Sequence, residues 1–461
     1  MANTNFSTLS ISPAQLKNLA SLGYKNMTEI QAQSLPHILK GKDIIAKAKT
    51  GSGKTAAFGI GLLDKINPRF FGTQALIICP TRELADQVGK EIRHLARNVP
   101  NIKLVLLCGG KPFGPQVGSL AHGAHIVVGT PGRLQDHLKK STLKIDQLKT
   151  LVLDEADRML DMGFSDVMDE IIGYTPMSRQ TMLFSATYPD NIKMMSRNIQ
   201  RDPISITVEA EHQSNVIKQL FYQVKRHERN SALLALFQHY RPASTVVFCH
   251  TKVQCNEVAQ LLQDSDIEAL AIHGDLEQRE RDQVLVRFSN NSCSVLVATD
   301  VAARGLDIKS LAMVINYELP RDPEIYIHRI GRTGRAGESG LAMSLFTENE
   351  QRRINNIEEL QNKPCLIDTP ASLDLDSTFT LRPPMCTIQL DGGRKDKMRP
   401  GDILGALTGE AGLEGKQIGK IDIFDRSSYV AIEHDAVRQA LNYLANGKVK
   451  GRFVRARKIK N

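Results

Sequence analysis

Residues 48–55 read Ala-Lys-Thr-Gly-Ser-Gly-Lys-Thr and follow, one residue later, the apolar run Asp43-Ile44-Ile45-Ala46. A glycine-rich turn that leads from a strand into a helix beginning with Lys-Thr presents backbone amides to phosphate groups. Ala48 stands where the usual Gly-x-x-x-x-Gly-Lys-Thr pattern has its first glycine, so the segment alone also fits an ordinary strand–turn–helix junction. The stretch predicts a parallel α/β sheet with a nucleoside triphosphate site at the end of one strand.

A second apolar run, Leu151-Val152-Leu153, ends in Asp154-Glu155-Ala156-Asp157. Two adjacent carboxylates at a strand end can divide their work, because one holds magnesium and the other polarises an attacking water. Taken alone, such residues are more often solvated or placed at a helix N-terminus. Both signals follow apolar strands and occur in this order, so together they predict nucleotide binding and hydrolysis.

The composition is that of an ordinary globular protein. The 461 residues are 41% hydrophobic and 24% charged, and this length is typical of about three domains. No apolar run is long enough to cross a bilayer, and the first eleven residues lack the features of a secretory signal, so we expect a cytoplasmic protein. Seven cysteines without a Cys-x-x-Cys pair are expected to be reduced and buried, and Cys249, His250 and Cys255 are interpreted as structural rather than metal-binding.

Short apolar runs alternate with helical stretches in two successive series, which predicts two parallel sheets covered by helices. The runs of the first series lie at 44–45, 76–79, 126–128, 151–153 and 182–184. Those of the second lie at 246–248, 270–272, 295–297, 313–315 and 342–345. The polar stretch from Asp202 to Gln219 is interpreted as the linker, which gives domains at 1–207 and 208–367. Polar motif residues follow the strands in both series, so the crevice between the domains is the expected site.

After a proline-containing linker at 368–382, residues 383–461 follow a βαββαβ pattern typical of a small RNA-recognition domain. Strands are expected at 386–390, 418–424, 428–433 and 452–458, and helices at 401–407 and 434–445. In this segment 15 lysines and arginines exceed 9 aspartates and glutamates by six, within a net charge of +9 for the whole chain. A polyanion is therefore the expected partner.

Several further motifs carry a resemblance to a known family. They are 23–31 (Gly-Tyr-Lys-Asn-Met-Thr-Glu-Ile-Gln), 80–85 (Pro-Thr-Arg-Glu-Leu-Ala), Gly109-Gly110, 130–133 (Thr-Pro-Gly-Arg), 185–187 (Ser-Ala-Thr), 303–307 (Ala-Arg-Gly-Leu-Asp) and 328–335 (His-Arg-Ile-Gly-Arg-Thr-Gly-Arg). In this order they resemble the DEAD-box RNA helicases over roughly residues 6–346. With the basic domain behind them, the chain is similar to a branch of the family that acts in bacterial large-subunit ribosome assembly. The resemblance implies two tandem RecA-like domains followed by an RNA-recognition-type domain.

The resemblance also implies how ATP and Mg²⁺ are held. Gln31 would read the edge of adenine, and Phe6 would stack on that base. The phosphates are expected to contact Thr50, Gly51, Ser52, Gly53 and Lys54, while Thr55 and Asp154 hold Mg²⁺. Glu155 is expected to orient and deprotonate the hydrolytic water.

From the second domain, the resemblance implies that Arg332 and Arg335 reach the γ-phosphate as arginine fingers when the two domains close. The alternative is a basic loop that binds phosphate without taking part in catalysis. Asp307 would bind the ribose hydroxyls, and His328 would link the nucleotide to Ser185 and Thr187.

The remaining motif residues are expected along the RNA backbone, where contacts ignore base sequence. They are Thr81, Arg82, Gly110, Arg133, Thr251, Thr299 and Arg304, of which Arg304 is equally suited to pair with a carboxylate. In the C-terminal domain the resemblance implies recognition of a hairpin of large-subunit (23S) rRNA in pre-50S particles. The candidate contacts are Arg394, Lys395, Lys397, Lys448, Lys450, Arg452 and Arg455, and the alternative is a solvated basic face that binds any RNA.

One departure from the usual RNA-recognition domain concerns base stacking. The first strand, 386–390, has no aromatic residue, and the third has only Tyr429. The sequence therefore does not predict the usual stacking surface.

Three functions fit these motifs. The first is an RNA-stimulated ATPase that unwinds short duplexes locally. The second is an ATP-gated RNA clamp in which unwinding is incidental, and the same motifs serve both. The third is a DNA translocase, which the segments 23–31 and 130–133 argue against. A monomer is expected.

Overall fold

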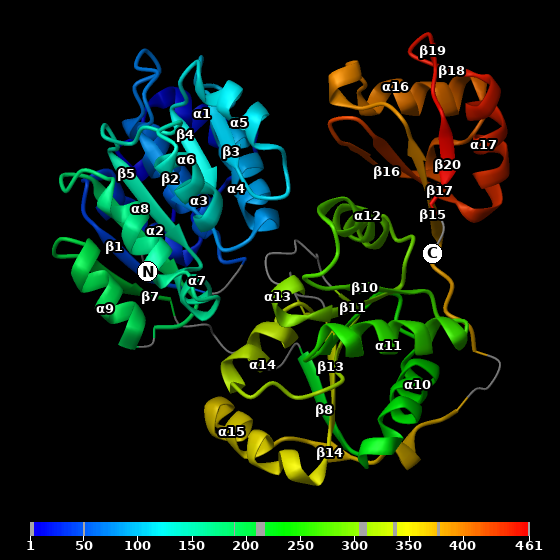
Figure 1. The fold of residues 1–461 in the computed structure, drawn as a ribbon. Helices are drawn as coiled ribbons and strands as arrows, with labels where there is room; N and C mark the ends of the chain where they lie inside the picture. The colour runs from blue at the N-terminus through cyan, green and yellow to red at the C-terminus, as the bar shows by residue number, and fades with distance from the viewer. Residues whose placement is uncertain are drawn as a thin grey trace. The chain divides into compact units, whose positions relative to one another are not determined.

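The structure is a computed structural model that describes residues 4–48, 51–188, 190–208, 217–303, 311–334, 339–375 and 379–459. Thr50, Arg304, Asp307 and Arg335, to which roles are assigned above, lie outside these ranges. The described residues fall into two compact units. The first is built on one seven-stranded sheet, and the second holds another seven-stranded sheet and a small C-terminal sheet (Figure 1).

The first sheet is parallel throughout and has the strand order β3-β4-β2-β5-β6-β1-β7. Its strands are β1 (Ile44–Lys47), β2 (Ala75–Ile78), β3 (Leu104–Leu107), β4 (Ile126–Gly129), β5 (Thr150–Asp154), β6 (Gln180–Ser185) and β7 (Ile204–Thr207). The central strands β2, β4, β5 and β6 are buried at every residue, which is why the sequence shows an apolar run within each of them.

Helices cover both faces of this sheet. They are α1 (Pro13–Ser21), α2 (Glu29–Leu39), α3 (Lys54–Lys65), α4 (Arg82–Leu95), α5 (Phe113–Leu120), α6 (Pro131–Lys139), α7 (Ala156–Asp161), α8 (Ser165–Gly173) and α9 (Asp190–Ile199). Alternate strand residues enter two separate cores, since Val152 and Phe184 pack on one side while Leu153 and Leu183 pack on the other. Phe58 of α3 meets Phe184 of β6 at a ring-centroid distance of 5.3 Å.

The second sheet repeats this plan with the order β10-β11-β9-β12-β13-β8-β14, again parallel. Its strands are β8 (Ile217–Gln223), β9 (Thr245–Cys249), β10 (Ala269–Ile272), β11 (Val295–Thr299), β12 (Met313–Asn316), β13 (Gly340–Phe346) and β14 (Ile367–Asp368). Its helices are α10 (Arg229–Tyr240), α11 (Lys252–Asp264), α12 (Gln278–Ser289), α13 (Asp300–Ala303), α14 (Pro323–Ile330) and α15 (Gln351–Gln361).

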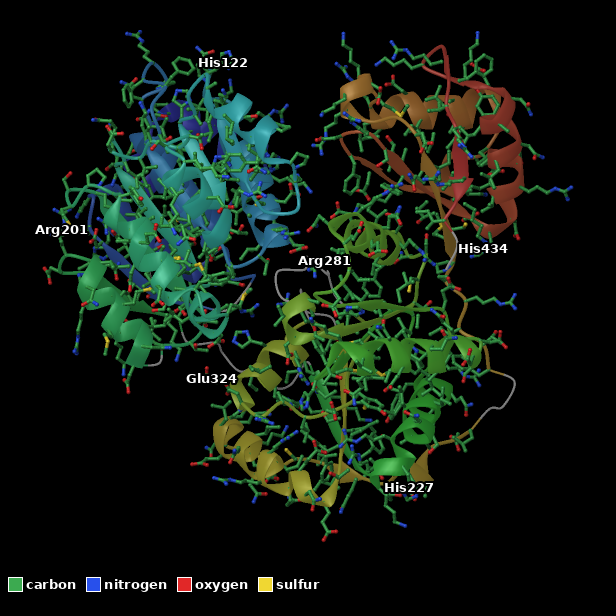
Figure 2. The ribbon with its side chains drawn as sticks, viewed as in Figure 1. His122, Arg201, His227, Arg281, Glu324 and His434 are labelled. Carbon is green, nitrogen blue, oxygen red and sulfur yellow. The ribbon has the colours of Figure 1, made fainter. Side chains whose placement is uncertain are left out.

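The C-terminal sheet is antiparallel, with the order β16-β17-β15-β20. Its elements are β15 (Met385–Leu390), α16 (Pro400–Gly405), a π-helical turn (Ala406–Glu410), β16 (Ile418–Ile423), β17 (Ser428–Glu433), α17 (Val437–Asn446) and β20 (Ala456–Lys458). His434, labelled in Figure 2, begins the short 3-10 turn that precedes α17. The βαββαβ prediction for this domain is confirmed.

Two details of the predicted strands are wrong. The interval 202–219 is not all linker, because β7 pairs with β1 and β8 pairs with β13. In β7, an edge strand, only Ile206 is buried, so it gives almost no apolar signal. The predicted strand at 452–458 is two strands, since β19 (Arg452–Phe453) pairs with β18 (Lys448–Val449) and β20 pairs with β15.

Cysteine burial also differs from expectation at one position. Six of the seven cysteines are buried free thiols, whereas Cys365 is half-buried. Among the helices of the described ranges, none combines the length and apolar character needed to cross a membrane.

Candidate active site and nucleic-acid interface

The glycine-rich turn between β1 and α3 is held against α2. Gly53 caps α3 with φ = 93°, a backbone conformation that favours glycine, and a Cβ there would lie 2.5 Å from Nε2 of Gln31. Gln31 Nε2 donates to the Gly53 carbonyl oxygen (3.1 Å), and Gln31 Oε1 accepts from the Thr28 amide (3.0 Å). Gln31, predicted from sequence as a base-reading residue, is thus joined to the glycine-rich turn that is predicted to bind phosphate.

Phe6, the other predicted adenine contact, lies in a short 3-10 turn, Phe6–Thr8, whose chain runs beside the start of α2: the Met27 amide donates to Thr4 O (2.6 Å). Its ring is 3% exposed and meets Tyr24 edge-on, with centroids 6.2 Å apart. A base could stack on Phe6 only after this ring is uncovered.

Three neighbouring strands deliver the polar groups of the site to one edge of the first sheet. Register places Asp154 of β5 opposite Phe184 of β6, and Phe184 opposite Ala46 of β1. The Ala48 amide donates to Ser185 O (3.0 Å), which fixes the start of the glycine-rich turn beside the end of β6. Because carboxyl ends of parallel strands share an edge, Asp154, Ser185 and Lys54 are brought to the same place.

Three buried polar atoms at this edge have no hydrogen-bond partner within the described ranges. Lys54 Nζ, Asp154 Oδ1 and Ser185 Oγ are all buried without a hydrogen bond. Burial raises the pKa of Asp154 to about 6, an effect that Lys54 opposes and the neighbouring Glu155 charge reinforces. An isolated buried charge is costly, so these groups suit a ligand that supplies phosphate oxygens to Lys54 and a hard divalent cation to Asp154.

Glu155 follows β5 with φ = 54°, a left-handed conformation that is unusual for a residue with a side chain and common at functional sites. Its Oε2 lies 3.3 Å from Nη1 of Arg158, and both residues are at least 95% buried. Two residues on, Asp157 Oδ2 accepts from both the amide and the hydroxyl of Thr187, each at 2.9 Å. Sequence reasoning assigned no part to Asp157 or Arg158, although Asp157 closes the acidic motif.

The predicted RNA contacts of the first unit gather around the loop that follows β3. Thr81 caps α4 by accepting from the Leu84 amide (3.2 Å). The Arg82 guanidinium lies over Gly109, since a Cβ there would be 3.2 Å from Nη2. Arg133 Nη1 donates to Lys111 O (3.0 Å), and Gly110 between them has φ = 74°. The side chains of Arg82 and Arg133 are thus held beside the backbone of Gly109 and Gly110.

An aromatic stack supports Arg133. The Phe113 ring lies parallel to His137 at a centroid distance of 4.1 Å, with Arg133 Cζ 5.7 Å and Lys140 Nζ 4.4 Å from its centre. His137 is fully buried and its ring nitrogens meet Thr142 Oγ1 (2.8 Å) and Gln116 Oε1 (3.2 Å). Burial, together with the Arg133 charge, lowers the pKa of His137 from 6.5 to about 4.

We expect acidification to destabilise the local structure around His137. The pKa of His137 is 6.5 in the unfolded chain and about 4 in the folded protein. The contribution of the neutral imidazole to stability is therefore complete above pH 6.5 and is lost as the pH falls toward 4. The loss should be about 1–2 kcal/mol after allowance for solvent screening, and amide hydrogen exchange in α6 at pH 7 and 4.5 would measure it. His137→Gln should flatten this dependence, whereas the exposed His122 (Figure 2), changed to Gln, should leave it unaltered. An equal loss of exchange protection between pH 7 and pH 4.5 in the unaltered protein and in both variants would show that His137 does not cause the pH dependence.

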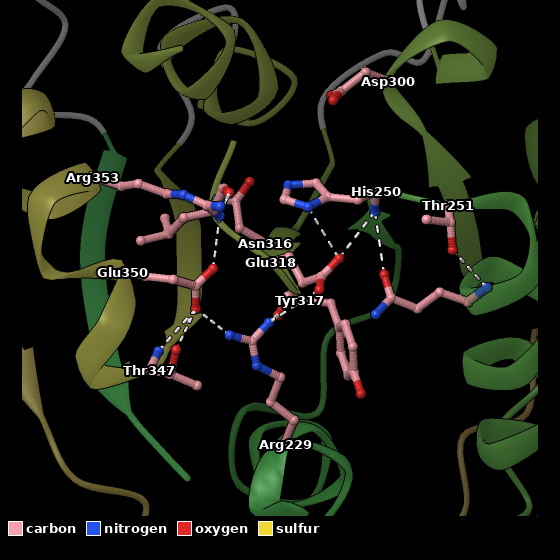
Figure 3. A network of polar contacts seen from close by, with 12 residues as sticks. Arg229, His250, Thr251, Asp300, Asn316, Tyr317, Glu318, Thr347, Glu350 and Arg353 are labelled. Carbon is pink, nitrogen blue, oxygen red and sulfur yellow. Dashed lines mark hydrogen bonds and ion pairs between the residues drawn. The ribbon is translucent and has the colours of Figure 1, made fainter. Parts of the chain in front are cut away.

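In the second unit, Thr251 and Thr299 lie at the carboxyl edge of the sheet. Register places Thr299 of β11 opposite Cys249 of β9, and Thr251 caps α11 by accepting from the Gln254 amide (3.2 Å). The neighbouring His250 is anchored by Glu318, whose Oε2 lies 3.3 Å from both its amide nitrogen and its ring Nδ1 (Figure 3). Thr251 is therefore the exposed end of an ordered turn.

A polar network stands behind this turn (Figure 3). Arg229 of α10 pairs with Glu350 and donates to Tyr317 O (2.8 Å), and Arg353 donates to Glu350 Oε1 (2.7 Å). Glu350 Oε2 also accepts from the Thr347 amide (2.9 Å). These contacts join α10, α15 and the chain just after β12, so the network fixes the segment from which Glu318 reaches His250.

Arg329 is the largest fully buried side chain of the described residues and was not singled out from sequence. Its Nε and Nη2 bind the two carboxylate oxygens of Asp300 at 2.7 and 2.8 Å, and its Nη1 donates to Asn316 Oδ1 (2.9 Å) and Glu318 O (2.7 Å). The same segment carries the predicted His328 and Arg332, of which Arg332 is 6% exposed. Arg329 thus anchors α14 to two strand ends.

The basic residues predicted in the C-terminal domain come together in two neighbouring turns. Lys450 Nζ donates to Lys397 O (2.5 Å), which joins the hairpin β18–β19 to the turn after Gly393. Lys450 and Gly451 have φ = 54° and 74°, the pattern of a tight type I′ hairpin turn. All seven predicted side chains are exposed, and they are Arg394, Lys395, Lys397, Lys448, Lys450, Arg452 and Arg455.

Three family comparisons match successive parts of this chain. The DEAD/DEAH box helicase family matches residues 28–195, the helicase conserved C-terminal domain matches 228–337, and the DbpA RNA binding domain matches 387–458. The chain is similar to the ATP-dependent RNA helicase DbpA of Escherichia coli (strain K12), with 54% identity covering 99% of this chain and 100% of that protein. It is also similar to the ATP-dependent RNA helicase DbpA of Bacillus subtilis (strain 168), with 38% identity covering 99% of each.

A solved structure is similar to the larger part of the chain. Dbp5 of S. cerevisiae bound to RNA and ADP BeF3 gives a TM-score of 0.71 at 30% identity, covering 80% of this chain and 96% of that one. Similarity to this protein therefore extends over most of the chain in fold as well as in sequence.

Proposed function

The chain belongs to the DEAD-box family of ATP-dependent RNA helicases, and on that premise we propose that its C-terminal domain brings an RNA-stimulated ATPase to a hairpin of large-subunit rRNA in the bacterial cytoplasm. It hydrolyses ATP and binds RNA as a member of this family. Within the proposal, the helicase domains occupy 1–207 and 208–367, a linker occupies 368–382, and the rRNA-binding domain occupies 383–461. The protein acts as a monomer.

The observation that supports the nucleotide site is that Lys54 Nζ and Asp154 Oδ1, at one edge of the first sheet, are buried and have no hydrogen-bond partner among the described residues. Lys54 neutralises the β- and γ-phosphates, and the amides of residues 50–53 line the remaining phosphate oxygens. Thr55 and Asp154 hold Mg²⁺, which supplies charge neutralisation between phosphates. Gln31 selects adenine, and Glu155 positions and deprotonates the attacking water.

The second helicase domain completes this site only when ATP and RNA favour closure. Arg332 and Arg335 then stabilise the charge of the transferring phosphate, and Asp307 binds the ribose. His328 links the nucleotide to the Ser185–Thr187 segment, in which Thr187 donates two hydrogen bonds to Asp157. Hydrolysis thereby depends on closure, and release of phosphate reopens the two domains.

RNA binding divides into general and specific parts. Thr81, Arg82, Gly110 and Arg133 of the first domain, with Thr251, Thr299 and Arg304 of the second, contact the backbone of a single strand. The exposed cations of the C-terminal turns contact the rRNA hairpin. Closure bends one strand and releases its complement, so short duplexes open without long-range translocation.

The proposal is tested by ATP hydrolysis with no RNA, with a generic single strand, and with large-subunit rRNA containing the hairpin. We expect the rRNA to stimulate turnover most, because the C-terminal domain raises its local concentration at the core. Deleting residues 383–461 should remove that advantage and leave the response to generic RNA intact. Equal stimulation of the full chain by the generic strand and by the rRNA would refute specific targeting. RNA-stimulated turnover without strand separation would favour an RNA clamp.

A further inference from the structure

The C-terminal domain contains a hollow between α16 and the hairpin β18–β19. Its volume is about 580 Å³, within the range of pockets that take small ligands. Its walls include Gly401, Asp402, Gly405, Glu410, Lys448 and Phe453. The hollow lies among the basic turns named above. The family's sequence motifs assign no role to the residues that line it.

Two helical glycines form one wall, and packing within the domain does not require them. A Cβ built on Gly401 or Gly405 would meet no atom within 4 Å, whereas one on Gly447 would lie 2.5 Å from the Tyr443 ring. Glycine is disfavoured inside helices, and these two lie four residues apart, on one face of α16. The helix then widens into a π-helical turn, a feature often found at functional sites. The missing side chains leave room for an external group.

An exposed aromatic ring forms the opposite wall. Phe453 is 71% exposed, although it is a large apolar residue in a domain with its own core. Lys448, its cross-strand partner, holds Nζ 5.2 Å from the centre of the ring. Tyr429, the aromatic residue that sequence analysis considered for base stacking, is only 3% exposed. The available stacking surface of this domain is therefore at the hairpin, because exposed aromatic rings are the platforms on which unpaired bases stack.

The charges around the hollow favour a base inside it and phosphate groups at its rim. Asp402 Oδ2 accepts from the Arg399 amide (2.8 Å) and from Lys450 Nζ (3.2 Å), and Glu410 Oε2 accepts from the Tyr443 hydroxyl (2.7 Å). In the part of the chain that the structure describes, these contacts engage one oxygen of each carboxylate. Carboxylates repel phosphate but accept hydrogen bonds from the amino groups of bases. Lys448 and Lys450 provide positive charge at the rim, where a sugar–phosphate backbone would pass.

We propose that this hollow takes up one unpaired nucleotide of the RNA bound by the C-terminal domain, with its base stacked on Phe453 and its phosphates beside Lys448 and Lys450. The inference rests on the proposed function, to which it adds a defined subsite. Phe453 supplies sequence-tolerant stacking, and Asp402 with Glu410 favours bases that present an amino group. Double-stranded RNA has no base free to enter, so the hollow selects loops and junctions.

The test uses the full-length protein and an rRNA stem-loop with 2-aminopurine at one unpaired position after another. Stacking on Phe453 should quench this fluorophore at one position. Phe453→Ala should abolish the quenching and weaken stem-loop affinity about tenfold, whereas Phe453→Tyr should retain both. Gly405→Leu should fill the hollow with a similar loss. Gly409→Leu is the matched control, since Gly409 lies on the same helical segment in open space but outside the hollow.

Failure of this inference differs from failure of rRNA targeting. If Phe453→Ala and Gly405→Leu bind the stem-loop like the unaltered protein while that protein still prefers it over generic RNA, the hollow is not a nucleotide site and targeting stands. If the unaltered protein shows no preference, targeting fails. In that case, Phe453-dependent quenching of a 2-aminopurine-labelled generic single strand supports the hollow, and its absence overturns it. Circular dichroism confirms that each variant is folded.

Discussion

Replacing Glu155 with glutamine is expected to lower RNA-stimulated ATP turnover by about 10²–10⁴-fold while ATP and RNA still bind. Glutamine keeps the shape of the side chain but cannot accept a proton from the attacking water. The position is fixed by the backbone, which leaves β5 in a left-handed conformation at φ = 54°. Phosphate release at saturating RNA measures the rate, and titration with a fluorescent ATP analogue measures binding.

A second glutamate provides a matched comparison. Glu170 on α8 accepts a hydrogen bond from Gln135 Nε2 (2.6 Å) and pairs with Lys139 (3.1 Å). Glu170→Gln removes the same charge, and we expect its turnover to stay within about twofold of the unaltered rate because surface pairs contribute little. Normal turnover by Glu155→Gln would exclude the role proposed for Glu155. Loss of ATP binding together with turnover would instead assign Glu155 to holding the nucleotide.

The central strands were predictable from sequence because burial on both faces makes them continuously apolar. Leu76 to Cys79 and Leu151 to Leu153 are examples, and all of these residues are buried. Four strands of the two parallel sheets were not predicted. Three of them, β7, β8 and β14, mix apolar with polar residues or are very short. The fourth, the edge strand β3, was missed although its residues are all apolar. In the C-terminal domain β19 and β20 were merged into one predicted strand and β18 was missed. Nothing in the local pattern of apolar residues reveals that Lys450 adopts positive φ and turns the chain back on itself.

Some residues of the candidate site could likewise be predicted from sequence, and others could not. Residues that we propose to contact the nucleotide or Mg²⁺, such as Lys54 and Asp154, stand in local motifs whose spacing can be recognised. Residues that hold the site together act across long stretches of sequence. The Asp157 contact with Thr187 spans 30 residues, and Phe453 faces a helix that begins at Pro400. Only the folded chain reveals which of many charged and aromatic residues become neighbours.

Arg329 is a further residue of this kind, and Arg329→Lys is expected to destabilise the second helicase domain by about 3–5 kcal/mol. Lysine cannot reproduce the two parallel hydrogen bonds to Asp300 or the two from Nη1 to Asn316 and Glu318 O. The change leaves Asp300 without its planar partner in a site where Arg329 is 2% exposed. Urea denaturation, followed by circular dichroism, measures the free energy of unfolding.

The comparison for this change is Arg352→Lys on α15, where the side chain is exposed and the expected effect is within about 0.5 kcal/mol. Equal stability of both variants would show that the buried guanidinium contributes no more than an ordinary surface cation. Because α14 carries His328 and ends just before Arg332, loosening its anchor should also displace both residues. Arg329→Lys should therefore lose RNA-stimulated turnover at temperatures where the protein is still folded, and this separates its positioning effect from simple unfolding.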